Sequence, residues 1–549
     1  MCGIAGVFHG CGADQAVALL VEAAVYLQHR GQDACGIATA TDDGQSYRFK
    51  DLGLVSDVFQ NPQNVQGLAG HMGVLHLRYP TAGSKGSEHL QPLYSNIGAR
   101  IFLAHRWCTM RTSSNEEIVL QNGNLLNCSE SREQLLDTDI PTPKHGVDSQ
   151  IILDVLSQEM QQVYRRNPNE FAISAIVAAL KVVYARCRGS FACIALVDES
   201  VLVGFRDAYG LKPLVYGRRL NPDGSVAYMF SSESVALEAL GFHDIRDVKP
   251  GEAVFVSKDP AMRVPRIFHW QVSPMISYSP DIFEFVYLAR PESMIDGISV
   301  HRSRYNMGEA LAETVRESLS TAEVDAIDVV IPIPETSYTG AYALASALRK
   351  PYAHGFVKNV YSTRTFIMPE QKLREKAVRR KLNPINDEFL GKVVLLVDDS
   401  IVRGTTSKEI VRMARAAGAK KIICASCSPP IRFDHVYGVD LAERRQLVAH
   451  GRTNLEICSQ LGCDDLIYLP IDRLIAACLK ARKTPLVECF EVGVFTGTYI
   501  TGGHEEYLRK TTRNRRAGKK EPLGLVQLSS SSSSSIEAVE CFPRLFTTR

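Results

Sequence analysis

Residues 393–407, VVLLVDDSIVRGTTS, constrain the fold more than any other stretch of this 549-residue chain. Five apolar residues run directly into Asp398 and Asp399, and a continuous apolar run of this kind is typical of a parallel strand buried on both faces. A loop of small and hydroxyl residues follows and opens into the helical pattern SKEIVRMARAAG. The stretch therefore predicts an α/β domain with a polar loop at the carboxyl end of a central strand.

This loop has the chemistry of a phosphate site. Backbone N–H groups and hydroxyls at the start of a helix can cradle a phosphate. The candidate residues are Gly404, Thr405, Thr406 and Ser407. The paired carboxylates of Asp398 and Asp399 suit ribose hydroxyls and a Mg²⁺ ion that neutralises pyrophosphate. Another kind of nucleotide loop is the alternative, but no Lys precedes the Thr pair, so the loop is not a Walker A motif.

Length and charge limit the class of protein. A chain of 549 residues exceeds one hydrophobic core, so we expect about two to four domains. The net charge of +2 provides no basic surface for nucleic acid or for an anionic membrane. We find no apolar run long enough to cross a bilayer and no signal-peptide pattern at the start. The 14 cysteines are scattered along the chain, which favours reduced thiols and a cytoplasmic location.

Composition shifts suggest the domain boundaries. We expect a first domain over residues 2–258, a Pro-rich connector over 259–280, and a strand–helix alternating domain with C-terminal helices over 281–503. Residues 504–549 contain a basic run and seven consecutive serines, so we predict a disordered tail.

The N-terminus offers a possible nucleophile. Cys2 follows the initiator Met and precedes Gly3, so removal of Met1 would place a thiol beside its own α-amine. An α-amine has an unperturbed pKa near ~8, so it can act as the base for that thiol. Taken alone, Cys2 could equally be an incidental residue near a chain end.

Four further motifs favour the catalytic interpretation of Cys2. They are LQHRGQDACGI (27–37), LRYPTAGS (77–84), NGNLLN (122–127) and VDSQIIL (147–153). Together with MCGIAGVF, and in this order, they resemble the glutaminase domain of N-terminal-nucleophile amidotransferases. The resemblance implies an αββα sandwich that hydrolyses glutamine through a thioester on Cys2.

The same resemblance assigns roles to residues in these motifs. Arg78 would bind the α-carboxylate of glutamine through its planar guanidinium, and Asp148 would pair with the ammonium group. Asn122 and the backbone N–H of Gly123 would form the oxyanion hole. Arg30 would contact the substrate or hold the loops of the domain near the site.

The second half of the chain resembles type I phosphoribosyltransferases. VVLLVDDSIVRGTTS resembles their phosphoribosyl-diphosphate signature, and Ser337 in PIPETS (332–337) resembles a hydroxyl ligand of Mg²⁺. STRTFIMP (362–369), which contains Arg364, and VRRKLNP (378–384) resemble the mobile catalytic loop and the basic segment after it. Such a loop would close over the leaving pyrophosphate and exclude water.

A glutaminase domain followed by a phosphoribosyltransferase domain is the order found in the glutamine phosphoribosylpyrophosphate amidotransferase family. The resemblance implies that ammonia released at Cys2 reaches C1 of the ribose and gives 5-phosphoribosylamine, the first committed intermediate of purine synthesis. It also implies a homo-oligomer and feedback inhibition by purine nucleotides. One branch of the family carries an iron–sulfur cluster and a propeptide before the nucleophile, and we expect that Cys2 here needs no propeptide cleavage. Because Asp281 stands where that branch has a ligand Cys, and Cys424 and Cys427 form the only CxxC and follow an apolar strand, we expect no cluster.

Two alternatives stay open. Another N-terminal-nucleophile amidotransferase would need a sugar isomerase domain or an SGGxDS loop, and neither is present. A chain that binds phosphoribosyl pyrophosphate without glutaminase activity is suggested by Leu75, by Val360 and by residues 362–363, which depart from the family pattern.

The strongest departure is an interruption of 16 residues. In the family LAH leads directly into NGNL, whereas here residues 106–121 separate His105 from Asn122. A surface insertion would cost little loop-closure entropy. We favour a sequence artefact such as an unspliced intron, because the interruption has no coherent apolar period and cuts a strand beside the oxyanion hole.

Overall fold

The computed structural model describes residues 2–9, 15–79, 90–96, 100–105, 148–167, 172–258, 265–359, 382–439, 441, 444–505 and 537–538. The chain divides into two compact units. Unit 1 comprises Met1–Tyr278, Val436–Val439 and Thr501–Arg549, and unit 2 comprises Ser279–His435 and Asp440–Ile500. The main division therefore lies inside the expected connector, 259–280.

Unit 1 contains two antiparallel sheets. The eight-stranded sheet has the order β11-β9-β10-β1-β4-β2-β3-β22, and the six-stranded sheet has the order β13-β12-β8-β7-β6-β5. Strands of the first sheet are β1 (Gly3–Phe8), β2 (Ala34–Ala40), β3 (Ser46–Leu52), β4 (Met72–Arg78), β9 (Val215–Leu220), β10 (Val226–Ser231), β11 (His243–Asp247) and β22 (Glu537–Ala538). Strands of the second are β5 (Leu93–Ser95), β6 (Ile101–His105), β7 (Ala192–Val197), β8 (Val201–Arg206), β12 (Glu252–Lys258) and β13 (Pro265–Gln271).

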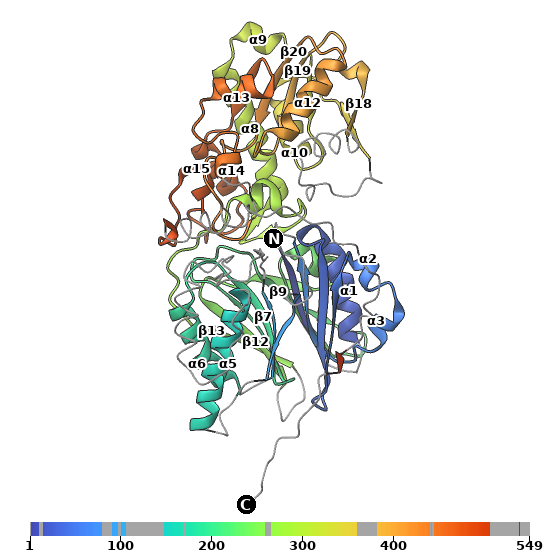
Figure 1. Ribbon diagram of the computed structural model, residues 1–549, viewed down its shortest axis with the longest axis vertical. Helices are drawn as coiled ribbons and strands as arrows, with labels where there is room; N and C mark the ends of the chain where they lie inside the picture. The colour runs from blue at the N-terminus through green and yellow to red at the C-terminus, as the bar shows by residue number, and fades with distance from the viewer. Residues whose placement is uncertain are drawn as a thin grey trace, which may run out of the picture. The chain divides into compact units, whose positions relative to one another are not determined.

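Helices cover the outer faces of both sheets. Helix α1 (Gln15–Leu27) packs on the first sheet, together with α7 (Ser234–Ala239). Helices α5 (Asp148–Arg166) and α6 (Ala172–Arg186) pack on the second sheet, on the opposite side of the unit (Figure 1). Side chains of both sheets, among them Ile4 and Ile194, share the core between them. The layers confirm the predicted αββα sandwich.

Short elements complete unit 1. They are the 3₁₀ helix η1 (Gln28–Arg30) and the helices α2 (Val55–Val58) and α3 (Pro62–Gln66). Strand β13 continues the second sheet beyond residue 258, so the sandwich includes part of the segment expected to be a connector.

Unit 2 is built on a four-stranded parallel sheet with the order β16-β19-β20-β21. The strands are β16 (Val329–Pro332), β19 (Val393–Asp398), β20 (Lys421–Ser426) and β21 (Asp465–Tyr468). The main helices are α8 (Val300–Ser318), α10 (Tyr338–Leu348), α12 (Thr405–Ala416), α13 (Asn454–Leu461) and α14 (Ile471–Lys480). Residues 393–397 are buried in the centre of this sheet, which confirms the predicted parallel α/β domain.

Smaller elements of unit 2 surround this sheet. Two short antiparallel pairs are β14 (Met294–Ile295) with β15 (Ile298–Ser299) and β17 (Phe356–Lys358) with β18 (Leu382–Pro384). The remaining helical turns are η3 (Glu284–Leu288), α9 (Thr321–Asp325), η4 (Asn386–Glu388), η5 (Arg444–Gln446) and α15 (Gly493–Thr496).

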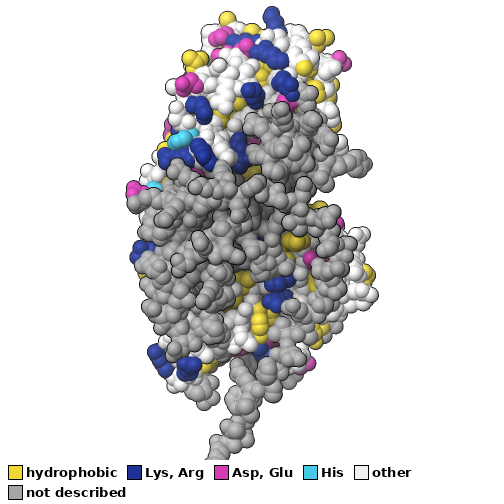
Figure 2. All heavy atoms as spheres, viewed as in Figure 1, with side chains coloured by type: hydrophobic (Ala, Val, Ile, Leu, Met, Phe, Trp, Pro, Cys, Tyr) yellow, Lys and Arg dark blue, Asp and Glu magenta, His cyan; other side chains and the backbone are white. Residues whose placement is uncertain are grey.

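The surface of unit 2 mixes charges of both signs. On the face drawn in Figure 2, Lys and Arg side chains lie among acidic and apolar ones rather than forming one uninterrupted basic surface. This distribution agrees with the near-neutral net charge. Across the described ranges, every helix is too short or too polar to cross a membrane.

Candidate active sites

Cys2 lies at the start of the central strand of unit 1. It directly precedes β1, which pairs with β4 through Gly3 and Leu77, so the thiol lies near the end of β4, where Arg78 is the last residue. The side chain of Cys2 is fully buried. The strand is also tied to the loop after β10, because the N–H of Ile4 donates to Ser232 Oγ at 2.9 Å. The candidate nucleophile is therefore held by backbone pairing on both sides of β1.

Arg78 forms an ion pair with Asp33 beside this thiol. Arg78 Nε lies 3.1 Å from Asp33 Oδ2, and the Asp33 N–H donates to the Arg78 carbonyl. Burial raises the pKa of Asp33, Arg78 lowers it, and Cys2 raises it further. The structure thus brings Cys2, Asp33 and Arg78 into one electrostatic cluster.

The turn before β2 needs a glycine to make this cluster. A Cβ on Gly31 would lie 2.4 Å from the carbonyl carbon of Leu77 and 2.7 Å from the backbone nitrogen of Arg78. Backbone atoms cannot move aside as a flexible side chain can, so only glycine allows the HRGQD segment to pass this close to β4.

Arg30 lies beneath the start of β1 and is fully buried. Its Nε forms an ion pair with Glu233, which is also fully buried, and His29 Nε2 lies 2.7 Å from the same carboxylate. A Cβ on Gly3 would lie 3.3 Å from Arg30 Cβ. These contacts support the prediction that Arg30 holds loops near the site, and its direct contact with substrate stays a prediction.

The rest of the predicted glutaminase site cannot be placed. Asn122, Gly123 and the interruption 106–121 lie outside the described residues. Asp148 is the first residue of α5, but the position of its side chain is not described. The roles of these residues stay predictions.

In unit 2 the predicted phosphate loop joins β19 to α12. Gly404 is the N-cap of α12 and has φ +72°, a left-handed conformation that favours glycine. Thr405 and Thr406 are the first two residues of the helix, and Thr406 is exposed. The backbone N–H groups of this first turn have the arrangement that binds a phosphate.

At the end of β19, the pKa values of Asp398 and Asp399 are both raised. Burial raises the pKa of Asp398 well above its usual range, and the charge of Asp399 raises it further. A hydrogen bond from the Ser407 hydroxyl acts in the opposite direction, so this hydroxyl faces Asp398. Burial raises the pKa of Asp399 to about 6, against the effects of Ser400 and Arg304. Two crowded carboxylates of this kind favour a cationic or hydrogen-bond-donating ligand.

Ser337 follows the strand next to β19, at the same carboxyl end of the parallel sheet as these carboxylates. It precedes α10, at the end of the loop that follows β16, and β16 pairs with β19 through Pro332 and Val397. The Ser337 hydroxyl is buried and donates to the Ile333 carbonyl. Within the described ranges there is no cluster of three or more His, Cys, Asp or Glu side chains suited to a metal. A carboxylate pair with one hydroxyl still fits Mg²⁺, which keeps several waters and binds substrate phosphates.

The residues that bear on an iron–sulfur cluster, Asp281, Cys424 and Cys427, have other surroundings in the structure. Asp281 Oδ2 lies 2.8 Å from His435 Nε2, and both side chains are buried. Cys424 lies on β20, and Cys427 follows that strand. Both thiols are buried, and a Cβ on Gly340 would lie 2.8 Å from Cys427 Sγ. Arg364 lies outside the described residues.

Several polar residues of these sites were missed by the sequence interpretation. Asp33, Ser232 and Glu233 support the Cys2 cluster, whereas Thr336 and Arg304 affect Asp399. The polar run SSES after the strand YMF was a usable signal for Glu233. Arg304 sits in an ordinary amphipathic helix, and nothing in its pattern distinguishes it.

Comparison with known proteins agrees with this arrangement. A glutamine amidotransferase domain model matches residues 108–239, and a phosphoribosyl transferase domain model matches residues 301–430. The amidophosphoribosyltransferase of Lachancea kluyveri is 45% identical over 521 residues, covering 94% of this chain and 96% of the relative. The amidophosphoribosyltransferase of Saccharomyces cerevisiae is 45% identical over 520 residues, with 94% and 96% covered. A solved structure of glutamine phosphoribosylpyrophosphate amidotransferase from B. subtilis, complexed with ADP and GMP, superposes with a TM-score of 0.73 at 31% identity. That match covers 92% of this chain and 98% of the other.

Proposed function

The chain belongs to the amidophosphoribosyltransferase family, and on this premise we propose how its residues divide the reaction between the two units. The enzyme is a glutamine-dependent phosphoribosyltransferase that catalyses the first step of purine biosynthesis. In the proposal, unit 1 releases ammonia from glutamine and unit 2 transfers it to C1 of phosphoribosyl pyrophosphate. The products are 5-phosphoribosylamine, pyrophosphate and glutamate.

In unit 1 the Cys2 sulfur attacks the side-chain amide carbon of glutamine. The α-amine of Cys2, freed by removal of Met1, takes the thiol proton and later passes it to the leaving ammonia. Arg78 binds the substrate α-carboxylate, while its contact with Asp33 through Nε fixes the plane of the guanidinium. Asp148 binds the substrate ammonium, and Asn122 with the Gly123 N–H stabilises the oxyanion. Water then releases glutamate from the thioester.

In unit 2 the loop residues bind the 5-phosphate and the carboxylates orient the ribose. The N–H groups at Gly404, Thr405 and Thr406 meet the phosphate at the N-terminus of α12, with Ser407 beside Asp398. Asp398 and Asp399 accept hydrogen bonds from ribose hydroxyls. When bound, Mg²⁺ at these carboxylates and Ser337 would neutralise pyrophosphate charge. Arg364 would contact the pyrophosphate from the catalytic loop.

Regulation and assembly follow the family by analogy. The B. subtilis structure is complexed with ADP and GMP, and we propose purine nucleotides as feedback inhibitors of this chain. A homo-oligomer and a cytoplasmic location stay predictions. The described part of unit 1 keeps Cys2 and Arg78 together, which supports an active glutaminase rather than a chain that only binds phosphoribosyl pyrophosphate.

The observation that carries the proposal is the buried Cys2 beside the Asp33–Arg78 pair, with a phosphate loop after β19 in the same chain. The test supplies phosphoribosyl pyrophosphate and Mg²⁺ with either glutamine or ammonium and measures pyrophosphate and glutamate. We expect pyrophosphate with both nitrogen donors, and one glutamate for each pyrophosphate when glutamine is supplied. Pyrophosphate formation with ammonium but not with glutamine would contradict the glutaminase half of the proposal.

A further inference from the structure

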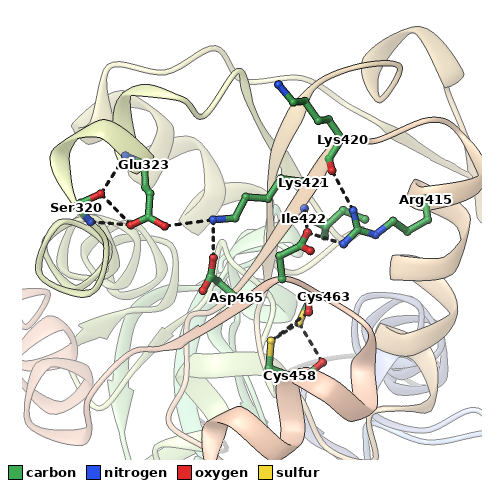
Figure 3. Close-up of polar contacts among 10 residues, drawn as sticks. Ser320, Glu323, Arg415, Lys420, Lys421, Ile422, Cys458, Cys463 and Asp465 are labelled. Atoms are coloured by element: carbon green, nitrogen blue, oxygen red, sulfur yellow. Dashed lines mark hydrogen bonds and ion pairs between the residues drawn. The ribbon is translucent and has the colours of Figure 1, made fainter.

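Two cysteines of unit 2 have their thiols in contact. Cys458 lies on α13 and Cys463 follows its C-cap, and their sulfur atoms are 3.5 Å apart (Figure 3). The Cys458 thiol also donates to the Cys463 carbonyl at 3.2 Å. Both residues line an open surface hollow of about 590 Å³, and they are 7% and 9% exposed. A small reagent in solvent can therefore reach a pair of thiols that already face each other.

The backbone after Cys463 is firmly held. The Asp464 carboxylate accepts hydrogen bonds from the Ile422 N–H at 2.6 Å and from Arg415. The Asp464 N–H in turn donates to the Ile422 carbonyl at 2.8 Å. Because this side is fixed to β20, a backbone movement that brings the two sulfurs together would fall on the last turn of α13.

That last turn contacts the phosphate loop. Leu461 is the last residue of α13, and a Cβ on Gly404 would lie 3.0 Å from Leu461 Cδ2 and 3.0 Å from Val448 Cγ2. Val448 is also bonded to the loop, because its N–H donates to the Val402 carbonyl at 2.9 Å. Gly404, in its left-handed conformation, therefore packs against two apolar side chains. One of them, Leu461, lies between the two cysteines in sequence.

We propose that Cys458 and Cys463 are an oxidation site, forming a reversible disulfide that weakens binding of phosphoribosyl pyrophosphate at the Gly404 loop. A disulfide requires a sulfur–sulfur distance of about 2.05 Å, so the thiols must approach by about 1.5 Å. Packed interiors transmit a displacement of this size, and Leu461 would carry it to Gly404. The effect on binding rests on the proposed function of this loop, whereas the disulfide itself does not.

Hydrogen peroxide is the oxidant that we name for this step. One sulfur attacks a peroxide oxygen, giving a sulfenic acid and water, and the second thiol then displaces a water molecule to form the S–S bond. Two S–H bonds are lost, one S–S bond forms, and the peroxide is reduced to two waters. Burial raises the pKa of Cys458 to about 12, and its contact with Cys463 and the nearby carboxylates of Asp465 and Asp464 raise it further. Contact with the Cys424 thiol and burial raise the pKa of Cys463. Because the thiolate is the nucleophile, oxidation should be slow at neutral pH and faster at higher pH.

The experiment treats the full-length protein with hydrogen peroxide, or with dithiothreitol as the reduced reference. Peptide mapping of an unreduced digest locates disulfides, and pyrophosphate release with ammonium gives KM for phosphoribosyl pyrophosphate. Ammonium is used because oxidation of Cys2 then cannot affect the result. Cys458→Ser and Cys463→Ser test the pair. If Cys458→Ser does not fold, Cys458→Ala is used in its place. Cys489→Ser removes an exposed thiol of the same unit and is the matched control.

We expect a Cys458–Cys463 cross-link and a rise in KM of about 5-fold or more, reversed by dithiothreitol. The pair variants should keep the reduced KM after peroxide treatment, and Cys489→Ser should respond like the unmodified chain. Oxidation of other thiols without this cross-link would overturn the pairing. A quantitative cross-link with unchanged KM would overturn the coupling to the loop. Absence of synthesis in the reduced protein would instead count against the proposed function, because the peptide map still tests the disulfide.

Discussion

Replacing Asp399 by Asn should make unit 2 more stable while abolishing synthesis. Burial raises the pKa of this carboxyl from 3.8 to about 6, so its ionised form is unfavourable in the folded chain. This rise in pKa corresponds to at most about 3 kcal/mol, and because the side chain is half-buried we expect about 1–2 kcal/mol. Asn keeps an oxygen that accepts the hydrogen bond from Ser400 Oγ, which is 2.8 Å long in the native chain. The stability gain therefore comes from removing charge rather than from new contacts.

The stability difference between Asp399→Asn and the native chain should depend on pH. The folded-state pKa is raised, so the ionised carboxylate destabilises the native chain fully above about pH 6, and this cost is lost as the pH falls toward 4. The advantage of Asp399→Asn should accordingly be largest at pH 7–8 and small near pH ~4.

The protein is incubated in increasing concentrations of urea and digested briefly with a protease. The appearance of peptides from unit 2 then measures the stability of unit 2 separately from that of unit 1. Asp387→Asn removes an exposed carboxylate of the same unit and is the control. A variant that is less stable than the native chain, or a stability difference independent of pH, would show that the Asp399 charge does not destabilise the folded chain.

Two further substitutions and one deletion test the substrate contact of Arg78, the buried ion pair of Arg30 and the role of residues 106–121. Arg78→Lys should lower kcat/KM for glutamine by about 10- to 100-fold, because a planar bidentate contact is lost, and it should leave ammonium-dependent synthesis unchanged; steady-state assays with both donors check this. Glu233→Gln leaves the buried Arg30 charge without its carboxylate and should destabilise unit 1 by about 3–5 kcal/mol. The same proteolysis method, applied to peptides from unit 1, measures this loss. Unchanged stability would show that the ion pair is unimportant. Deleting residues 106–121 should raise glutaminase activity and leave ammonium-dependent synthesis unchanged, and the native transcript should lack the corresponding segment; equal glutaminase activity with and without it would argue for a harmless surface insertion.

The sequence was sufficient to predict the structure of segments whose pattern depends on neighbouring residues. The apolar run before Asp398 predicted a buried parallel strand, and Gly404 with the following hydroxyl residues predicted the turn that starts α12. Both features depend on neighbouring residues, so their pattern survives without knowledge of the tertiary fold.

Contacts between distant residues could not be read in this way. The pairing of Arg30 with Glu233 joins residues about two hundred positions apart, and no local period encodes it. Strand β13 was assigned to a connector because the segment around it is rich in Pro, and only its pairing with β12 makes it part of the sheet. Asp33 was quoted within a motif, yet its ion pair with Arg78 depends on the close approach of Gly31 to β4.

We propose that the two half-reactions use separate sets of residues and are joined by ammonia. The direct measurement compares Cys2→Ala with the unmodified chain, using glutamine and, separately, ammonium as nitrogen donor. We expect Cys2→Ala to lose synthesis from glutamine and to keep synthesis from ammonium near the unmodified level. Equal loss of both activities in a variant that remains folded would contradict it.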